Sequence, residues 1–389
     1  MTISAAYALQ NNANARIFAY QIGAPDRSPM VHSLGNFSKK RHKMKALRPS
    51  SIVTLKEVAA SAGVHPSTVS RALNERTRHL VAADVAQKVM ASAKQLGYRS
   101  NSAAASLRTG NSQTIGVMLP DISNPVFGPI LGGITEALFS KGYATIIADV
   151  GPGGNDTSEL IERLIGRQVD GLILATALRH DKAVATCVRL GIPVVLVNRA
   201  EEDGHASAVV SDDEKGMALA VDHLVQLGHK VIGHIAGSPD LSTGFRRRQG
   251  YETAMRRHGL TAGPVEVAQT YSREAGRTAA AKLLRNRKIT AIVAANDLLA
   301  LGIYLEAFAR GLRCPDDLSI VGHNDMPLVD MLQPPLTTVR ISHREMGQEA
   351  AQLLLRSIAE GPGRAARNVV LMPELIIRGS TASCPHNSN

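Results

Sequence analysis

The chain has 389 residues and a hydrophobic content of 44%, which predicts two or three domains with packed cores. Its three widely separated cysteines exclude a disulfide framework and a cysteine zinc site. The sequence has no signal-peptide core and no apolar run of about 18 residues, which predicts a cytoplasmic protein without a membrane span. The net charge of +11 lies at the N-terminal end, because residues 1–110 hold sixteen of the 44 Lys and Arg but only four of the 33 Asp and Glu, and a basic head on a near-neutral body predicts nucleic-acid binding.

Residues 1–49 have no sustained hydrophobic periodicity and end in a basic cluster around Lys39, Lys40 and Arg41. We expect this extension to be disordered. Two interpretations stay open. Either the cluster is a basic arm that touches DNA, or translation starts at Met44 and the extension is not made.

Residues 53–74, with the sequence VTLKEVAASAGVHPSTVSRALN, predict two short helices joined by a turn at Gly63. Apolar residues repeat at helical spacing from Leu55 onward, so one face of the first helix is apolar. Thr54 and Glu57 have the spacing of a capping box, which places the start of this helix.

The second of these helices opens at His65-Pro66 and turns Val69 and Ala72 inward. Its outer face is then polar and cationic, which fits the major groove of DNA, although an ordinary surface helix pair is the alternative. The residues of this stretch that we expect at the DNA are Thr54, His65, Pro66, Ser67, Thr68, Ser70, Arg71 and Asn74.

The string A-x-x-A-G-V-x-x-S-T-V-S-R-x-L-N, from Ala59 to Asn74, closely resembles the DNA-binding head of the lactose-repressor (LacI/GalR) family. A third helix at about 83–96, ended by Gly97, would complete an all-α helix-turn-helix head over residues 50–97. The resemblance implies a homodimer that binds a palindromic operator in double-stranded DNA.

Residues 98–112 begin Y-R-S-N-S-A-A-A-S-L, which resembles the family's hinge helix, Y-x-P-N-x-x-A-x-x-L. In that family paired hinge helices lie in the minor groove and a Leu, matched here by Leu107, wedges between bases. Ser100 replaces the family's Pro and so removes a backbone restraint, and a flexible linker is the alternative. The DNA contacts that the resemblance implies here are Tyr98, Asn101, Ala104 and Leu107.

From residue 113 onward, apolar strand-like runs alternate with amphipathic helical segments, which predicts parallel sheets flanked by helices in two lobes around a cleft. The expected strands are 115–119, 144–148, 172–175, 194–197, 231–235, 291–294 and 319–321. The expected helices are 130–141, 158–167, 183–190, 216–227, 250–258, 273–287, 298–310 and 344–359. This α/β pattern resembles the family's two-lobed periplasmic-binding-protein-like core over residues 113–380, and the tail, 381–389, carries no leucine heptads.

The sequence matches none of four common enzyme motifs. The glycines at 151–154 include Pro152 and do not form a G-x-G-x-x-G turn, and we find no phosphate loop, no H-E-x-x-H and no G-x-S-x-G. We therefore expect no catalytic residue, no metal and no cofactor. A solute-binding protein would account for residues 113–380 but not for the head, and a regulator that answers to a protein partner stays open as the alternative.

The candidate effector ligands are polar residues that follow predicted strands, where ligands bind in such folds. Asn124 and Phe127 match the family's N-P-F-F loop, and Arg247 lies three residues before Gly250, where the family places the Arg that clamps an effector hydroxyl or carboxylate. The effector-binding residues that we expect are Asn124, Phe127, Asn198, Arg199, Arg247, Asn296, Asp297 and Asn324.

Two of these residues, Asn198 and Asn324, stand where relatives usually carry Asp. The change removes two negative charges from a pocket that holds arginines, so the hypothesis is an anionic effector such as a sugar acid. Asp297 has a second interpretation, as a helix cap or first-turn acid. The predicted function is a repressor of a catabolic operon, switched by an effector that favours one of two lobe arrangements.

Overall fold

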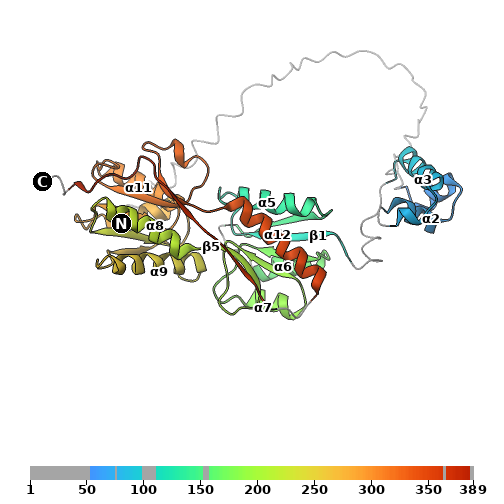
Figure 1. Cartoon of the computed structure of the whole chain (residues 1–389), viewed down its shortest axis with the longest axis horizontal. Coiled ribbons are helices and arrows are strands. Elements are labelled where there is room, and N and C mark those ends of the chain that lie inside the picture. Colours follow the sequence, from blue (N-terminus) through green and yellow to red (C-terminus); the bar gives the residue numbers. More distant parts are fainter. Residues whose placement is uncertain (1–52, 75–76, 99–110, 152–156, 362–364, 386–389) are drawn as a thin grey trace, which may run out of the picture. The chain divides into compact units, whose positions relative to one another are not determined.

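The computed structural model describes residues 53–74, 77–98, 111–151, 157–361 and 365–385. The chain divides into two compact units between Arg99 and Ser100, and Figure 1 identifies their elements. The predicted extension of residues 1–49 and the hinge residues Asn101, Ala104 and Leu107 lie outside the described residues.

The first unit is a head of three helices, α1 (Leu55–Ala62), α2 (Pro66–Leu73) and α3 (Ala83–Leu96), with a 3-10 turn η1 (Arg78–Leu80) before α3. The predicted capping box opens α1, where the Thr54 N–H donates to Glu57 Oε2 over 2.6 Å. Gly63 ends α1 with a φ of 66°, a left-handed conformation that favours glycine. These elements confirm the predicted helix-turn-helix and third helix.

Small apolar side chains form the core of the head. The buried members are Val58, Ala59, Ala62, Val69, Ala72, Ala86, Val89 and Ala93. Short side chains allow the three helices to approach closely. Because α2 contributes Val69 and Ala72 to this core, its opposite face carries the polar residues that the sequence assigns to DNA.

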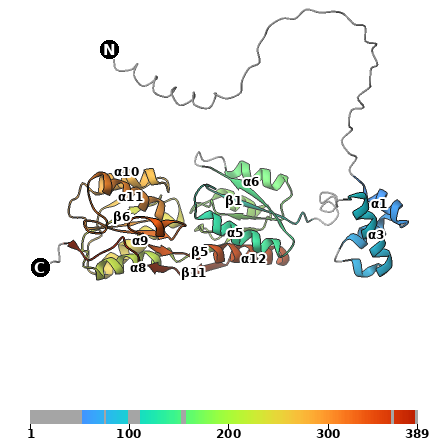
Figure 2. The same cartoon turned by 90° about the horizontal axis from the view of Figure 1, so that it is seen from above.

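The second unit has two lobes, and the sheet of the first lobe has the parallel strand order β11-β5-β4-β3-β1-β2. Figure 2 shows α5 and α12 on one side of this sheet and α6 on the other. The strands are β1 (Thr114–Leu119), β2 (Ala144–Asp149), β3 (Gly171–Leu174), β4 (Val194–Val197), β5 (Ser207–Ser211) and β11 (Asn368–Leu371). The helices are α5 (Phe127–Phe139), α6 (Thr157–Gly166), α7 (Lys182–Arg189) and α12 (His343–Glu360).

The sheet of the second lobe has the order β12-β10-β9-β8-β6-β7, and only the β10–β12 pair is antiparallel. Helices α10 and α11 lie on one side of it, and α8 and α9 lie on the other (Figure 2). The strands are β6 (Ile232–Ala236), β7 (Val265–Val267), β8 (Ala291–Ala294), β9 (Ser319–Asn324), β10 (Thr337–Arg340) and β12 (Glu374–Ile376). The helices are α8 (Asp213–Gln226), α9 (Ser242–Arg257), α10 (Arg273–Leu283) and α11 (Asp297–Ala309).

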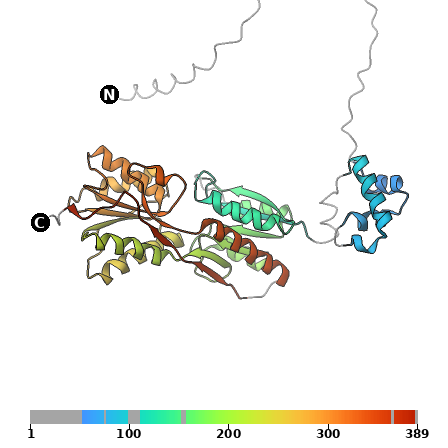
Figure 3. The same ribbon diagram turned by 45° about the horizontal axis from the view of Figure 1, so that its top comes forward.

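The chain passes between the lobes after β5, after β10 and between β11 and β12, and Figure 3 shows these connections side by side. Each lobe is therefore built from segments that are distant in sequence. Parallel connections of this kind are places about which two lobes can hinge.

The α/β two-lobed fold and every predicted strand and core helix are confirmed, with shifted ends. The largest difference is α9, which begins at Ser242 and not at residue 250. Strands β5, β7, β10, β11 and β12 were not predicted. Among the described helices, none is both long and apolar enough to cross a membrane.

Candidate functional site

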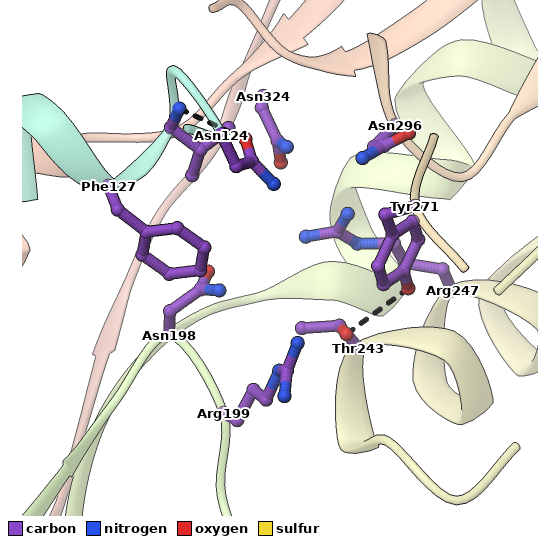
Figure 4. Close-up of a pocket in the computed structure, with 10 residues that line it drawn as sticks. Asn124, Phe127, Asn198, Arg199, Thr243, Arg247, Tyr271, Asn296 and Asn324 are labelled. Carbon is purple, nitrogen blue, oxygen red and sulfur yellow. Dashed lines mark hydrogen bonds between the residues drawn. The ribbon is translucent and has the colours of Figure 1, made fainter. Parts of the chain in front are cut away.

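A pocket that is partly open to solvent lies between the lobes at the carboxyl ends of β1, β4, β8 and β9. Figure 4 shows side chains from both lobes that point into it. The lining residues are Asn124, Val126, Phe127, Asn198, Arg199, Thr243, Arg247, Tyr271, Asn296 and Asn324. No carboxylate is among them, so the lining offers amides, hydroxyls, apolar surface and two cations.

Arg247 projects from α9 into the pocket and is 3% exposed. Its Nε donates to Asp213 Oδ1 over 2.7 Å, and its Nη1 donates to the Ala295 carbonyl over 2.6 Å. Burial raises the pKa of the Asp213 carboxyl, and the Arg247 charge offsets part of that effect. One carboxylate thus neutralises this guanidinium and fixes its orientation.

Arg199 follows β4, and no carboxylate of the described residues forms an ion pair with it. It is 9% exposed, and its Nε is buried without a hydrogen-bond partner among the described residues. Burial lowers the pKa of its guanidinium, and the nearby Arg247 adds to that lowering. An unpaired buried cation is unfavourable unless a ligand supplies the missing charge or acceptor.

Four further polar groups of the pocket are held by hydrogen bonds within the protein. Asn296 caps α11 by accepting the Leu299 N–H over 2.9 Å, and Asn124 Oδ1 accepts the Val126 N–H over 3.2 Å. Thr243 Oγ1 and Tyr271 OH lie 3.2 Å apart and belong to different segments of the second lobe (Figure 4). These groups are therefore positioned before any ligand enters.

Two pocket residues adopt a backbone conformation that is uncommon for side chains other than glycine. Asn198 has a φ of 65° and Asn324 a φ of 112°. Asn tolerates the left-handed region better than most residues because its short side chain bonds locally. Strained residues of this kind concentrate at ligand sites, which agrees with their position at the strand ends.

The structure brings seven of the eight expected effector residues to the pocket. Asp297 is not in the lining. It is the first residue of α11, and its carboxylate accepts from the Met326 N–H over 2.8 Å and from the Thr338 hydroxyl over 2.6 Å. Its second interpretation, a first-turn acid, describes this position better.

Three lining residues were missed by the sequence reasoning, namely Val126, Thr243 and Tyr271. Thr243 lies one helical turn before Arg247, so a correct start for α9 would have placed both on one face. Tyr271 lies in the connection before α10 and gives no sequence signal of its own.

On the head, the expected DNA-contacting residues gather around the start and the outer face of α2. Thr54, His65, Ser67, Arg71 and Asn74 are exposed. Pro66, Thr68, Ser70 and Tyr98 are half-buried, and Tyr98 also packs against the core of the head. The other expected contacts, Asn101, Ala104 and Leu107, fall outside the described residues.

Glu201, Asp203 and His205 form one group of possible metal ligands that the sequence reasoning did not single out. Glu201 accepts the N–H groups of His205 and Ala206, and its Oε2 lies 2.9 Å from His205 Nδ1. These hydrogen bonds fold the loop between β4 and β5, which accounts for the buried carboxylate.

Two family profiles match the chain. The one described as "Bacterial regulatory proteins, lacI family" matches residues 54–101, and the "Periplasmic binding protein-like domain" matches residues 221–381. The first spans the three helices of the head, and the second spans most of the second lobe and the returning segments.

Relatives match over nearly their full length. The transcriptional regulator MalR of Streptomyces coelicolor is 38% identical over 85% of this chain and 97% of its own. The lac repressor dimer bound to operator and the anti-inducer ONPF has a TM-score of 0.77 and 28% identity over 85% of this chain and 99% of its own. A complex of the regulator CelR with cellobiose has a TM-score of 0.65 and 28% identity, covering 84% and 99% of the two chains.

Proposed function

The chain belongs to the lacI family of bacterial DNA-binding transcriptional regulators, and from this premise we propose that it represses a catabolic operon by binding a palindromic operator as a homodimer. The basic head, with its polar α2 face, supplies the DNA contacts. The residues that contact DNA are those expected from the sequence, with Arg71 on the exposed face of α2 as the main cation. The protein acts in the bacterial cytoplasm, where its operator lies.

Selection of bound duplexes from a random library tests this part of the proposal, with the full chain as the protein. A palindromic motif is the expected result, because a two-fold dimer reads two equivalent half-sites. Recovery of unrelated sequences, with binding that disappears as salt rises, would leave only backbone contacts and would contradict sequence-specific regulation.

The effector of this regulator is a small anionic sugar derivative, such as a sugar acid, bound in the interlobe pocket. The observation that carries this proposal is the unpaired Arg199 guanidinium in a lining without a carboxylate. The pair Arg247–Asp213 is already balanced, so a ligand carboxylate would balance Arg199. Phe127 borders the pocket and offers an apolar surface against which a sugar ring can pack.

Calorimetry with matched sugars tests the effector class. Galacturonate and galactose, or glucuronate and glucose, differ only by the carboxylate, so each pair isolates the charge. The acid should bind about 10-fold more tightly or better, since a charge-assisted hydrogen bond contributes about 1.5–3 kcal/mol. Binding of the neutral member alone would contradict the proposal.

Effector binding changes operator affinity through the lobes. A ligand that contacts both lobes favours one lobe arrangement, and the operator affinity shifts by the ligand's differential affinity for the two states. The predicted hinge, residues 98–112, would carry this change to the head. Operator titrations with and without the sugar acid that binds in calorimetry would measure the coupling directly.

A further inference from the structure

A second pocket lies in the first lobe, at the opposite end of the sheet from the effector pocket. It is bordered by the amino ends of β4, β5 and β11, where Val194, Ser207 and Arg367 line it, whereas the effector pocket lies at the carboxyl end of β4. The four residues of β4 separate the two pockets by about 13 Å. The pockets share no lining residue, so each can hold a ligand of its own.

Much of the lining of this second pocket is aliphatic. Ile192, Pro193 and Val194 line it where the chain enters β4. Helix α12, which packs beside β5, adds Leu353 and Ile358 from its last two turns (Figure 2). All of these side chains except Val194 are only half-buried. Apolar surface that stays partly open to water gains free energy when the apolar part of a ligand covers it.

Two arginines bring positive charge to the same pocket. Arg356 lies one turn after Leu353, so both side chains are on the face of α12 that lines the pocket. Arg367 is held at the start of β11, because its N–H donates to the Ser207 hydroxyl over 2.9 Å and its carbonyl accepts the Ala208 N–H over 3.1 Å. Within the described part of the chain, neither guanidinium has an ion pair or a hydrogen bond.

The other ionisable residues of the lining do not balance these charges. The ring of His205 is hydrogen-bonded to Glu201, over 2.9 Å. Glu360 is the only carboxylate among the lining residues, and it has an interaction of its own within the protein. A guanidinium is always charged and can bind a carboxylate through two donors. The pocket thus combines an aliphatic lining with an excess of positive charge.

We propose that the second pocket binds a small amphipathic carboxylate, a molecule with an aliphatic body and one carboxylate group. The carboxylate accepts hydrogen bonds from Arg356 and Arg367, and the aliphatic body covers the apolar lining. The site goes beyond the proposed function, because it uses no residue of the head or of the effector pocket. It gives the protein a second ligand, distinct from the polar sugar derivative proposed for the cleft between the lobes.

Calorimetry with octanoate and 1-octanol tests this site in the full chain. The two probes share an aliphatic chain and differ in the head group, so the comparison isolates the charge. Octanoate should bind at least about 10-fold more tightly than 1-octanol, as expected for charge-assisted hydrogen bonds. No binding of octanoate, or equal binding of the two probes, would overturn the proposal.

A double variant locates the bound carboxylate. Arg356→Gln with Arg367→Gln removes both charges from exposed side chains, so we expect the fold to be kept. Octanoate should then bind about 10-fold more weakly, and 1-octanol should bind as it does to the wild type. Arg189→Gln is the matched control, because Arg189 is an exposed arginine at the end of α7 that lines neither pocket. Octanoate affinity should not change in this control.

Wild-type affinity of the double variant for octanoate would overturn the proposal. If octanoate binding were lost instead in Arg199→Met, the carboxylate would lie in the effector pocket, and the second pocket would have no such ligand. Selection of an operator motif and binding of sugar acids do not enter this experiment. A failure of the proposed function and a failure of the second site are therefore distinguishable.

Discussion

The guanidinium of Arg179 lies over the ring of Phe245, with 3.7 Å between its central carbon and the ring centroid, and this contact joins the two lobes. Arg179 follows β3 in the first lobe, and Phe245 belongs to α9 in the second. The Arg179 backbone N–H also donates to the Asp240 carbonyl of the second lobe over 2.9 Å, and its Nε and Nη2 are held within the first lobe by Glu202, each over 2.9 Å. A latch of these residues therefore holds the lobes together outside the effector pocket.

Loss of this latch should weaken lobe closure. Arg179→Ala removes a cation–π contact worth about 1 kcal/mol and the hydrogen bond that Nη1 donates to the Pro239 carbonyl of the second lobe over 3.2 Å. The chain has no Trp, so Phe245→Trp supplies a single fluorescent reporter at the latch. Adding Arg179→Ala to that variant should expose the indole and shift its emission to longer wavelength.

A matched control uses another arginine pair. Arg163 binds Glu159 four residues earlier on the surface of α6 and does not bridge the lobes. Arg163→Ala should leave the emission of the Phe245→Trp variant unchanged. Identical spectra for the Arg179→Ala and Arg163→Ala variants would mean that the latch does not hold the lobes together.

Arg199→Met should stabilise the protein and remove binding of the acidic effector. A buried cation without a partner is unfavourable, and a methionine of similar length fills the space without charge. We expect the free energy of unfolding in urea to rise by roughly 1–2 kcal/mol. Arg248→Met, which alters a half-exposed arginine that binds Glu252, is the control and should change neither quantity appreciably. A less stable Arg199→Met variant would show that the guanidinium has a partner in the free protein.

Arg247→Met should have the opposite effect on stability. This substitution leaves the Asp213 carboxylate buried and unpaired, and the removal of one partner of a buried pair costs about 3–5 kcal/mol. Adding Asp213→Leu removes the orphaned charge and should restore much of the loss, which urea unfolding would measure. A double variant no more stable than Arg247→Met would contradict the account of Asp213 as the orphaned group.

Some residues of the pocket could be predicted from the sequence, and others could not. Asn124, Asn198 and Asn324 follow predicted strands whose apolar runs are evident in the sequence, and the rule that ligands bind at the carboxyl ends of parallel strands therefore placed them at the cleft. Tyr271 could not be placed, because its loop reaches the pocket only through the packing of α10 on the second sheet. Its hydroxyl meets Thr243 from a segment nearly thirty residues away.

The first and last residues of the helices and strands were harder to predict than the presence of these elements. The first two turns of α9 carry Arg246, Arg247 and Arg248, and this polar stretch shows little apolar periodicity. Their helical conformation is supported by tertiary contacts, such as that of Arg246 with Glu214 over 3.1 Å. Similarly, β11 and β12 are short edge strands that depend on β5 and β10 as partners, which the local sequence does not reveal.

Buried histidines should make the protein less stable in acid. Burial lowers the pKa of both His234 and His343 to about 4, well below the unfolded value of about 6.5. The unfolded chain then binds more protons than the folded chain between these values, so the stability present above pH 6.5 is lost as the pH falls toward 4. Urea unfolding across this range should show a loss on the order of 3 kcal/mol for each histidine. His343→Gln should flatten the profile, and an unchanged slope would contradict the contribution of His343.

Asp297 should oppose this trend. Burial raises the pKa of its carboxyl from 3.8 to about 7, although the Thr338 hydroxyl and the Met326 N–H favour the charged form. The folded chain therefore keeps a proton that the unfolded chain loses, and this residue's contribution to stability declines as the pH rises from about 4 to 7. The Asp297→Asn side chain does not titrate, and its amide can hydrogen-bond both the Met326 N–H and the Thr338 hydroxyl.

The stability difference between Asp297→Asn and the wild type is the quantity that tests this sign. It should be near its minimum at pH 4, where the wild-type carboxyl is protonated in the folded state. It should then grow by about 4 kcal/mol in favour of the variant by pH 7. The reason is that the wild-type carboxyl keeps its proton up to about pH 7 in the folded protein but ionises above about pH 4 in the unfolded chain. A difference that stays constant between pH 4 and 7 would mean that the Asp297 carboxylate is ionised throughout. The hydrogen bonds from Thr338 and Met326 would then outweigh its burial.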